Sequence, residues 1–218
     1  MSDRRQRLEQ AALYLVCDAV SDAFVTRALR GGVDLVQLRM KDAGDEEIIA
    51  TGRRLRAAVR AAGALLIVND RPDLAAALDA DGVHVGQDDM AVARARETVG
   101  AQRLVGLSTH SAGQIEAAAN AGADYIGVGP VHATPTKPGR APVGLELVRY
   151  AAGHSPLPFF AIGGIDTTNV AAVRAAGARR IAVVRALTES DDPEAAAAAL
   201  RDAVADESRR TEARLGAA

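Results

Sequence analysis

The stretch SAGQIEAAANAGADYIGV, residues 111–128, joins an Ala-rich helical segment at 111–121 to a β-rich run at 124–128. Between the two, Gly122-Ala123-Asp124 places a helix-ending glycine two residues before a charged residue that opens the strand. The same joint recurs at Gly32-Val33-Asp34 and at Gly177-Ala178-Arg179. A recurring joint of this kind predicts repeated βα units around a parallel sheet.

Eight β-rich runs alternate with helical stretches such as 45–62 and 166–176 along the whole chain. The runs are 13–17 (LYLVC), 34–39 (DLVQLR), 64–68 (ALLIV), 82–85 (GVHV), 103–107 (RLVGL), 124–128 (DYIGV), 158–162 (PFFAI) and 180–184 (RIAVV). Eight such units predict a single-domain (β/α)8 TIM barrel with its core at about residues 11–205. A doubly wound open sheet is the competing architecture, and the absence of a Gly-x-Gly-x-x-Gly motif after the first run favours the barrel. In both folds, ligands bind at the carboxyl ends of the strands.

The composition limits the class of protein. The 218 residues are 49% hydrophobic and 25% charged, which excludes disorder as the main state. With 26 basic and 28 acidic residues, the chain lacks the positive field that nucleic-acid binding needs. No signal-type or membrane-spanning apolar segment is visible, so we expect a cytoplasmic protein, with a tail at 206–218 that frays. The single cysteine, Cys17, lies in an apolar run and is expected to be a buried core residue.

Lysine is rare in this chain. Of the 26 basic residues only Lys41 and Lys137 are lysine, and the other 24 are arginine. The second β-rich run ends Gln37-Leu38-Arg39-Met40-Lys41, and alternation puts Gln37, Arg39 and Lys41 on one face. In a barrel that face points into the mouth, where the two cations need an anionic ligand. A solvated edge strand is the alternative.

Carboxylates follow two strands that should be neighbours. Asn69-Asp70 comes after the third run, and Gly86-Gln87-Asp88-Asp89 comes after the fourth. Neighbouring strand ends can share one cation, and oxygen ligands without cysteine or paired histidines suit Mg²⁺ better than Zn²⁺. The alternative is that Asp70 and one of Asp88 and Asp89 are helix N-caps.

Two further loops carry the features of phosphate sites. The connection 129–140 holds Thr134, Thr136, Lys137 and Arg140, which are donors that a phosphate requires, although it could be a solvated loop. The seventh run ends at Gly163-Gly164 and the eighth at Arg185, where many barrels bind phosphate. There, glycine admits the anion to the backbone amides, and a helix that starts near Thr167 would direct its positive end toward it.

Three histidine-containing segments carry less weight. Ser108-Thr109-His110 follows the fifth run, but the chain has no Gly-x-Ser-x-Gly elbow and hydrolase chemistry has little support. His84 is expected to point into the barrel and to serve core packing. No role is assigned to His154.

Taken together, these motifs resemble the thiamine-phosphate synthase family. The resemblance rests on Gln37-Leu38-Arg39-Met40-Lys41, Val68-Asn69-Asp70, Gly82-Val83-His84-Val85-Gly86-Gln87-Asp88-Asp89, Thr134-Pro135-Thr136-Lys137 and Ile162-Gly163-Gly164-Ile165. It implies a (β/α)8 transferase that joins 4-amino-2-methyl-5-hydroxymethylpyrimidine diphosphate to a thiazole phosphate, with Mg²⁺ present. The products would be thiamine phosphate and pyrophosphate, in thiamine biosynthesis.

The resemblance also implies a role for each matching residue. The pyrimidine diphosphate would be bound by Gln37, Arg39, Lys41, Asn69, Ser108 and Lys137, of which Arg39, Lys41, Ser108 and Lys137 would be catalytic. Mg²⁺ would be bound by Asp70 and Asp89. The thiazole phosphate would face Thr134, Thr136, Gly164, Val184 and Arg185. Arg185 stands where the family usually has serine.

Two other functions stay open at this stage. One is a thiazole tautomerase of the same fold, which lacks the diphosphate and metal residues, and the other is a noncatalytic sensor of a phosphorylated metabolite. The expected partners are small molecules and a second copy of the chain.

Overall fold

The computed structural model describes residues 3–134 and 141–205, and it contains a closed barrel of parallel strands in the order β1 to β8. The strands are β1 (Leu13–Cys17), β2 (Leu35–Leu38), β3 (Leu65–Asn69), β4 (Gly82–Val85), β5 (Leu104–Thr109), β6 (Tyr125–Val128), β7 (Phe159–Ile162) and β8 (Ile181–Val183). Each of the eight predicted runs overlaps one strand, and β1 pairs with β8 to close the ring. The (β/α)8 prediction is confirmed, and the open-sheet alternative is excluded.

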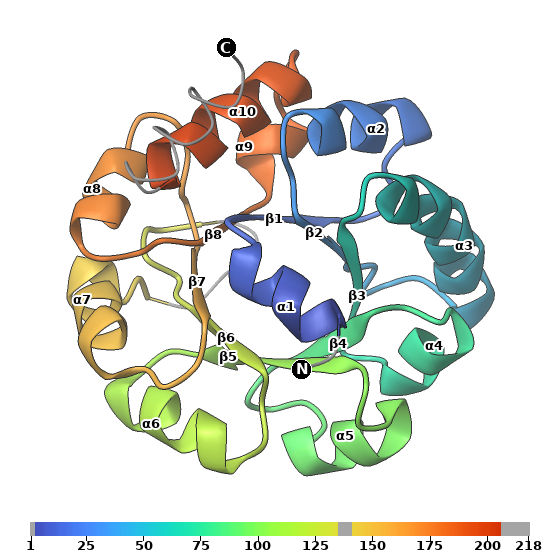
Figure 1. Cartoon of the computed structure of the whole chain (residues 1–218), viewed down its shortest axis with the longest axis horizontal. Helices are drawn as coiled ribbons and strands as arrows, with labels where there is room; N and C mark the ends of the chain where they lie inside the picture. Colours follow the sequence, from blue (N-terminus) through green and yellow to red (C-terminus); the bar gives the residue numbers. More distant parts are fainter. Residues whose placement is uncertain (1–2, 135–140, 206–218) are drawn as a thin grey trace.

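Helices surround the barrel as an outer ring, except for the N-terminal helix, which lies across one opening of the barrel (Figure 1). In the described part of the chain they are α1 (Asp3–Gln10), α2 (Asp22–Arg30), α3 (Asp45–Ala61), α4 (Pro72–Ala77), α5 (Val92–Val99), α6 (Ala112–Asn120), α7 (Gly144–His154), α8 (Val170–Ala175), α9 (Arg185–Thr188) and α10 (Pro193–Val204). None of the described helices is long and apolar enough to cross a membrane.

The glycine joint adopts the expected conformation. Gly32, Gly122 and Gly177 have φ values of +98°, +87° and +103°, a region that residues with a Cβ seldom occupy. In two of these joints the residue that follows is an aspartate, whose carboxylate accepts hydrogen bonds from the backbone of a neighbouring strand. Asp34 accepts from the amide of Leu13 at 3.0 Å, and Asp124 accepts from the amide of Val105 at 2.8 Å. The joint therefore ends a helix and also aligns two strands.

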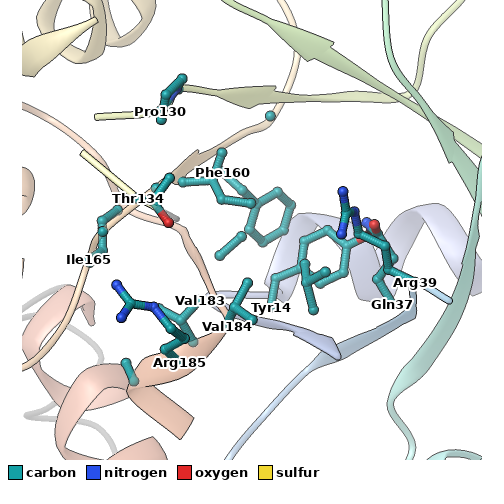
Figure 2. A pocket seen from close by; sticks show the side chains of 18 of the residues that line it. Tyr14, Gln37, Arg39, Pro130, Thr134, Phe160, Ile165, Val183, Val184 and Arg185 are labelled. Carbon is teal, nitrogen blue, oxygen red and sulfur yellow. The ribbon is translucent and has the colours of Figure 1, made fainter. Parts of the chain in front are cut away.

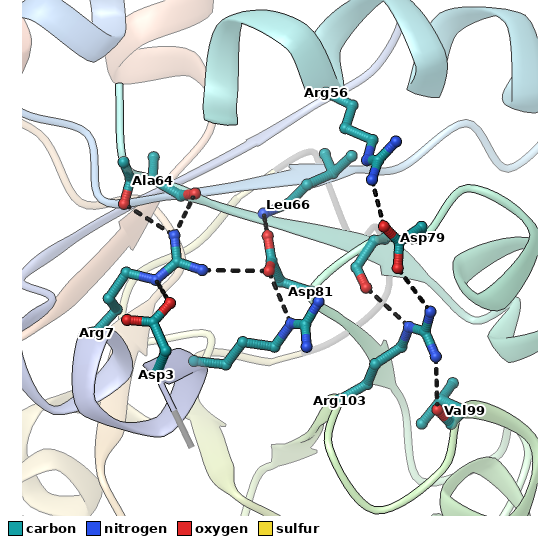
Figure 3. A network of polar contacts seen from close by, with 12 residues as sticks. Asp3, Arg7, Arg56, Ala64, Leu66, Asp79, Asp81, Val99 and Arg103 are labelled. Carbon is teal, nitrogen blue, oxygen red and sulfur yellow. Dashed lines mark hydrogen bonds and ion pairs between the residues drawn. The ribbon is translucent and has the colours of Figure 1, made fainter. Parts of the chain in front are cut away.

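The polar N-terminal segment forms a helix, α1, which lies across one opening of the barrel (Figure 1). Its Leu8 is 2% exposed and packs with residues of the barrel interior. Ion pairs fasten the helix to this opening. Arg7 pairs with Asp81, whose other carboxylate oxygen accepts from the amide of Leu66 at 2.9 Å (Figure 3). The helix therefore closes the amino-terminal end of the barrel and leaves the opposite end open.

Strand alternation divides the apolar residues into two layers. The larger layer packs between strands and helices and includes Val36, Leu38 and Cys17. The smaller layer fills the barrel and includes Tyr14, Tyr125 and Phe160. Cys17 is 3% exposed, and burial raises the pKa of its thiol to about 12, so the prediction of a core cysteine is confirmed.

The helix that was expected to start near Thr167 begins three residues later, at Val170. The reason is a turn stabilised by a side chain. The Asp166 carboxylate accepts from the backbone amide of Thr168 at 2.8 Å and from its hydroxyl at 2.6 Å, and Asn169 accepts from the amide of Asp166 at 3.1 Å. Because these contacts satisfy the backbone in a turn, the predicted helix start at Thr167 is wrong.

Candidate active site

A cavity of about 410 Å³ opens at the carboxyl ends of the strands. Figure 2 shows Gln37 and Arg39 on one side of it, Thr134 and Arg185 on the other, and the rings of Tyr14 and Phe160 between them. The predicted site residues that line it are Gln37, Arg39, Asn69, Ser108, Thr134, Gly164, Val184 and Arg185. Lys41, Asp70 and Asp89 do not line it but lie next to it, beyond Asn69.

The basic face of β2 is oriented as the alternation predicts. Val36 and Leu38 pack outward under the helices, while Gln37 and Arg39 face the cavity. Gln37 is only 4% exposed, and its Nε2 donates to the hydroxyl of Tyr14 at 2.6 Å. The edge-strand alternative is wrong because β2 is paired on both sides.

Lys41 and two carboxylates form a polar cluster beside the cavity. The Lys41 Nζ lies 3.5 Å from Asp70, and the Asn69 Nδ2 donates to Asp70 at 2.5 Å. The Asp89 carboxyl lies within hydrogen-bonding reach of Asp70. Burial raises the pKa of Asp70, and the negative charge of Asp89 raises it further. Two carboxyl groups in contact, one with a raised pKa, are an arrangement that a shared cation would stabilise.

The backbone of both loops is shaped to bring these carboxyl groups together. Asp70 has a φ of +60°, which is rare for a residue other than glycine, and its amide donates to the carbonyl of His84 at 2.8 Å. Asp89 accepts from the amide of Gly86 at 2.9 Å, and a Cβ at Gly86 would come within 2.5 Å of the same carboxylate oxygen. Asp89 is therefore anchored by its own loop.

The N-cap alternative for these aspartates is wrong. The N-cap residue of α4 is Arg71, that of α5 is Ala91, and neither helix has a side-chain cap hydrogen bond. Within residues 3–134 and 141–205, no group of three or more His, Cys, Asp or Glu side chains could hold a metal ion. The described residues bring together two carboxylates here, Asp70 and Asp89, which are oxygen donors of the kind that Mg²⁺ prefers.

The opposite side of the cavity is a glycine turn after β7. Gly163 and Gly164 have φ values of +106° and +62°, and a Cβ at Gly163 would lie 2.5 Å from the Cα of Pro130. The carbonyls of Ile162 and Gly163 accept from the amides of Val131 and His132 at 2.8 and 3.0 Å. Since the carbonyls are held by the β6–α7 loop, the turn is rigid and lets a ligand approach the backbone closely.

Arg185 is the first residue of α9 and lines the same side of the cavity. Its Nη1 lies 3.9 Å from Glu189, and 44% of its side chain is exposed. An exposed ion pair at that distance is weak, so the guanidinium can exchange Glu189 for an anionic ligand. Both interpretations of Arg185, ligand binding and pairing with Glu189, are therefore compatible with its position.

Part of the long loop after β6 is described. Thr134 lines the cavity, whereas Thr136, Lys137 and Arg140 lie outside the described residues. The placement of the second lysine is therefore untested. The first, Lys41, stands at the polar cluster, where a cation was expected.

Several cavity residues were not predicted as site residues. Tyr14 and Phe160 form the floor, His110 and Asp166 lie at the rim, and His84 contributes its ring as well as filling the core. The His84 Nε2 lies 3.0 Å from the hydroxyl of Ser108, so core packing alone is not its role. Tyr14 and Phe160 lie in runs that are apolar throughout, so strand alternation gave little signal for them.

Comparisons with known proteins agree on one family. A sequence model described as "Thiamine monophosphate synthase" matches residues 13–187. A thiamine-phosphate synthase of Saccharopolyspora erythraea is 53% identical over 211 residues, covering 90% of this chain and 94% of that protein. One from Synechocystis sp. is 50% identical over 197 residues, covering 89% of this chain but 57% of that protein. The chain therefore spans little more than half the length of several curated relatives.

Solved structures give the same result. A thiamine phosphate pyrophosphorylase from Pyrococcus furiosus superposes with a TM-score of 0.82 at 34% identity, covering 92% of this chain and 96% of that one. A 3-hexulose-6-phosphate synthase superposes with a TM-score of 0.66 at 22% identity, covering 89% of this chain and 100% of that one. The second likeness concerns the fold alone.

Proposed function

The chain belongs to the thiamine monophosphate synthase family, and from that premise we propose that it joins an aminopyrimidine diphosphate to a thiazole phosphate. The products are thiamine phosphate and pyrophosphate. One observation carries the proposal: a cavity is lined by Arg39 on one side, with Lys41 and a carboxylate pair beside it, and by a glycine turn with Arg185 on the other side. Such a cavity suits two anionic substrates side by side.

The reaction breaks one bond and forms one. The bond between the pyrimidine methylene carbon and the diphosphate oxygen breaks, and the electron pair leaves with the diphosphate. The thiazole nitrogen then forms a bond to that carbon, and the aminopyrimidine ring delocalises the positive charge in between. Arg39 and Lys41 stabilise the charge that develops on the departing group, and Ser108 and Asn69 orient the pyrimidine side. Positioning replaces a covalent nucleophile, in keeping with the absence of a Gly-x-Ser-x-Gly elbow.

Mg²⁺ is the cation we propose for Asp70 and Asp89. The fit rests on the donor set, which is two oxygen ligands in contact with each other, with Asp70 partly buried and its pKa raised. When bound, Mg²⁺ would supply a Lewis acid for the diphosphate oxygens. Lys41 remains within reach of Asp70 and would hold the diphosphate from the other side.

The thiazole phosphate is assigned to the glycine turn, Val184 and Arg185, with Thr134 and Thr136 from the long loop. A guanidinium can hold a phosphate with two parallel hydrogen bonds, whereas serine offers one donor. The competing pair with Glu189 is long and exposed, so it competes weakly with a dianion.

We expect Arg185→Ser to raise the Michaelis constant for thiazole phosphate about 10- to 150-fold. This factor corresponds to about 1.5–3 kcal/mol of binding free energy, the value of a hydrogen bond to a charged group. The constant for the pyrimidine diphosphate should stay near its parental value. Steady-state kinetics with each substrate varied in turn measures both. Glu189→Gln is the matched control, because it removes the competing carboxylate and should leave the thiazole constant equal or lower. If neither constant changes in Arg185→Ser, only the backbone at this position serves the site.

The deciding experiment incubates the purified chain with both substrates and Mg²⁺ and follows thiamine phosphate and pyrophosphate. A thiazole tautomerase would release no pyrophosphate, and a sensor would bind a phosphate without turnover. The carboxylate pair next to Lys41 favours the synthase over both, because neither alternative has a diphosphate to neutralise. A cytoplasmic location and a homo-oligomer stay predictions.

A further inference from the structure

An unbroken chain of side-chain hydrogen bonds crosses the barrel beneath the cavity. Gln37 Nε2 donates to the Tyr14 hydroxyl at 2.6 Å, and that hydroxyl lies 3.0 Å from the hydroxyl of Tyr125. The Tyr125 hydroxyl lies 3.3 Å from Nδ1 of His84, whose Nε2 lies 3.0 Å from the Ser108 hydroxyl. The two ends of the chain, Gln37 and Ser108, both line the cavity, whereas Tyr125 is fully buried and does not.

The number of available protons decides which atom donates in each of these hydrogen bonds. Burial raises the pKa of both tyrosine hydroxyls, so each keeps one proton to donate. With Gln37 donating to Tyr14, both tyrosine protons find an acceptor within the chain of hydrogen bonds only when Tyr14 donates to Tyr125 and Tyr125 donates to Nδ1 of His84. The ring then carries its proton on Nε2 and donates to Ser108, whose own proton is left for the cavity. The opposite direction leaves the Tyr14 proton without an acceptor in this chain of hydrogen bonds unless the Gln37 amide is turned over, with its oxygen toward Tyr14.

Gly106 supplies the space for the central bond of this chain. It lies in β5, and a Cβ there would come within 2.5 Å of the Tyr125 hydroxyl and would overlap Nδ1 of His84. Its φ is not in the left-handed region, so its backbone does not require glycine. The missing side chain therefore serves the contact between Tyr125 and His84.

We propose that Tyr125 is a positioning residue that holds His84 in the Nε2–H form and so couples the amide orientation of Gln37 to the donor role of Ser108. The Gln37 oxygen then faces the cavity as an acceptor, and Ser108 faces it as a donor. This pattern matches an aminopyrimidine, which has an amino donor and ring-nitrogen acceptors. It rejects an oxopyrimidine, whose carbonyl would need a donor at Gln37. If the Gln37 amide were turned over, every hydrogen bond from Gln37 to Ser108 would reverse its direction, and Ser108 would no longer donate to the cavity.

The assignment of substrate in this inference rests on the proposed function, but the tautomer does not. The first experiment therefore uses ¹⁵N NMR of histidine-labelled protein without substrate. We expect His84 to show the Nε2–H pattern in the parent and in the control Tyr150→Phe, whose hydroxyl bonds Glu116 outside the barrel. Tyr125→Phe should show a substantial Nδ1–H population. A parental Nδ1–H form, or an unchanged spectrum in Tyr125→Phe, overturns the proposal.

Should Tyr125→Phe fail to fold, Gly106→Ala takes its place, because the added methyl group pushes the same two side chains apart. The second experiment compares binding of the aminopyrimidine diphosphate with that of its 4-oxo analogue. We expect Tyr125→Phe to lower the preference for the amino compound about tenfold, the effect of one hydrogen bond, with the thiazole phosphate constant unchanged. An unchanged preference contradicts the coupling. If the His84 tautomer depends on Tyr125 but the protein makes no thiamine phosphate, only the proposed function is contradicted.

Discussion

Asp89→Ala is expected to lower Mg²⁺-dependent turnover by at least about 10³-fold, because losing one of the two proposed carboxylate ligands would remove several kcal/mol of charge stabilisation in the transition state. The barrel should remain folded, since Asp89 is exposed and the substitution removes no core volume. Turnover is measured as pyrophosphate release over a range of Mg²⁺ concentrations, and folding by thermal unfolding of the same sample.

Asp88→Ala is the matched control, because it removes an adjacent carboxylate of the same loop. Asp89 lies within hydrogen-bonding reach of Asp70, raises the pKa of that carboxyl and is anchored by the amide of Gly86. We expect Asp88→Ala to keep most of the activity. Equal losses in the two variants would refute the choice of ligand. A loss in Asp89→Ala that high Mg²⁺ restores fully would reduce its role to affinity.

The orientation of β2 could be predicted because its two faces differ in chemistry. Val36 and Leu38 are apolar and Gln37 and Arg39 are polar, so only one orientation buries the apolar pair under the helices. The helix-to-strand joints were predictable for a similar reason. The backbone at these joints has a positive φ, as at Gly32, Gly122 and Gly177, and glycine is the residue that adopts it readily. A glycine at the end of a helical segment can be recognised from the neighbouring sequence alone.

The floor of the cavity could not be predicted in the same way. Strands of a parallel barrel are buried on both faces, so runs such as LYLVC and PFFAI are apolar throughout and alternation carries little contrast. Tyr14 and Phe160 are therefore indistinguishable from the outward-facing residues beside them until the barrel is closed. The contact between Tyr125 and His84 depends on a missing side chain at Gly106, in a third strand, which no local pattern reveals.

The carboxylate pair lies between these cases. Because Asp70, Asp88 and Asp89 lie in loops that follow neighbouring strands, the sequence predicts that carboxylates from the two loops meet. The choice between Asp88 and Asp89 rested on the family resemblance. The structure adds the physical reason for their geometry, which is the positive φ of Asp70 and the Gly86 amide that anchors Asp89. Both depend on backbone conformations of single loop residues. The preference of aspartate for helix N-caps favoured a structural role for these residues. That interpretation is wrong because Arg71 and Ala91 occupy the N-cap positions of α4 and α5.

Lys137→Ala is expected to lower kcat about 10²-fold or more while changing the Michaelis constant for thiazole phosphate by less than about threefold. The argument rests on charge and on composition. The leaving diphosphate gains negative charge only as its bond to carbon breaks, so a cation that meets it contributes to the transition state more than to substrate binding. In a chain with 24 arginines and two lysines we expect lysine where a compact ammonium is needed, and the other lysine, Lys41, lies 3.5 Å from Asp70 beside the cavity. Lys137→Arg should therefore rescue poorly, because the larger planar guanidinium cannot occupy the same point.

Arg149→Ala, which removes an exposed cation paired with Glu146, controls for net charge and should leave kcat unchanged. An Arg variant at position 137 as active as the parent would show that charge alone matters there, and the argument from lysine would fail.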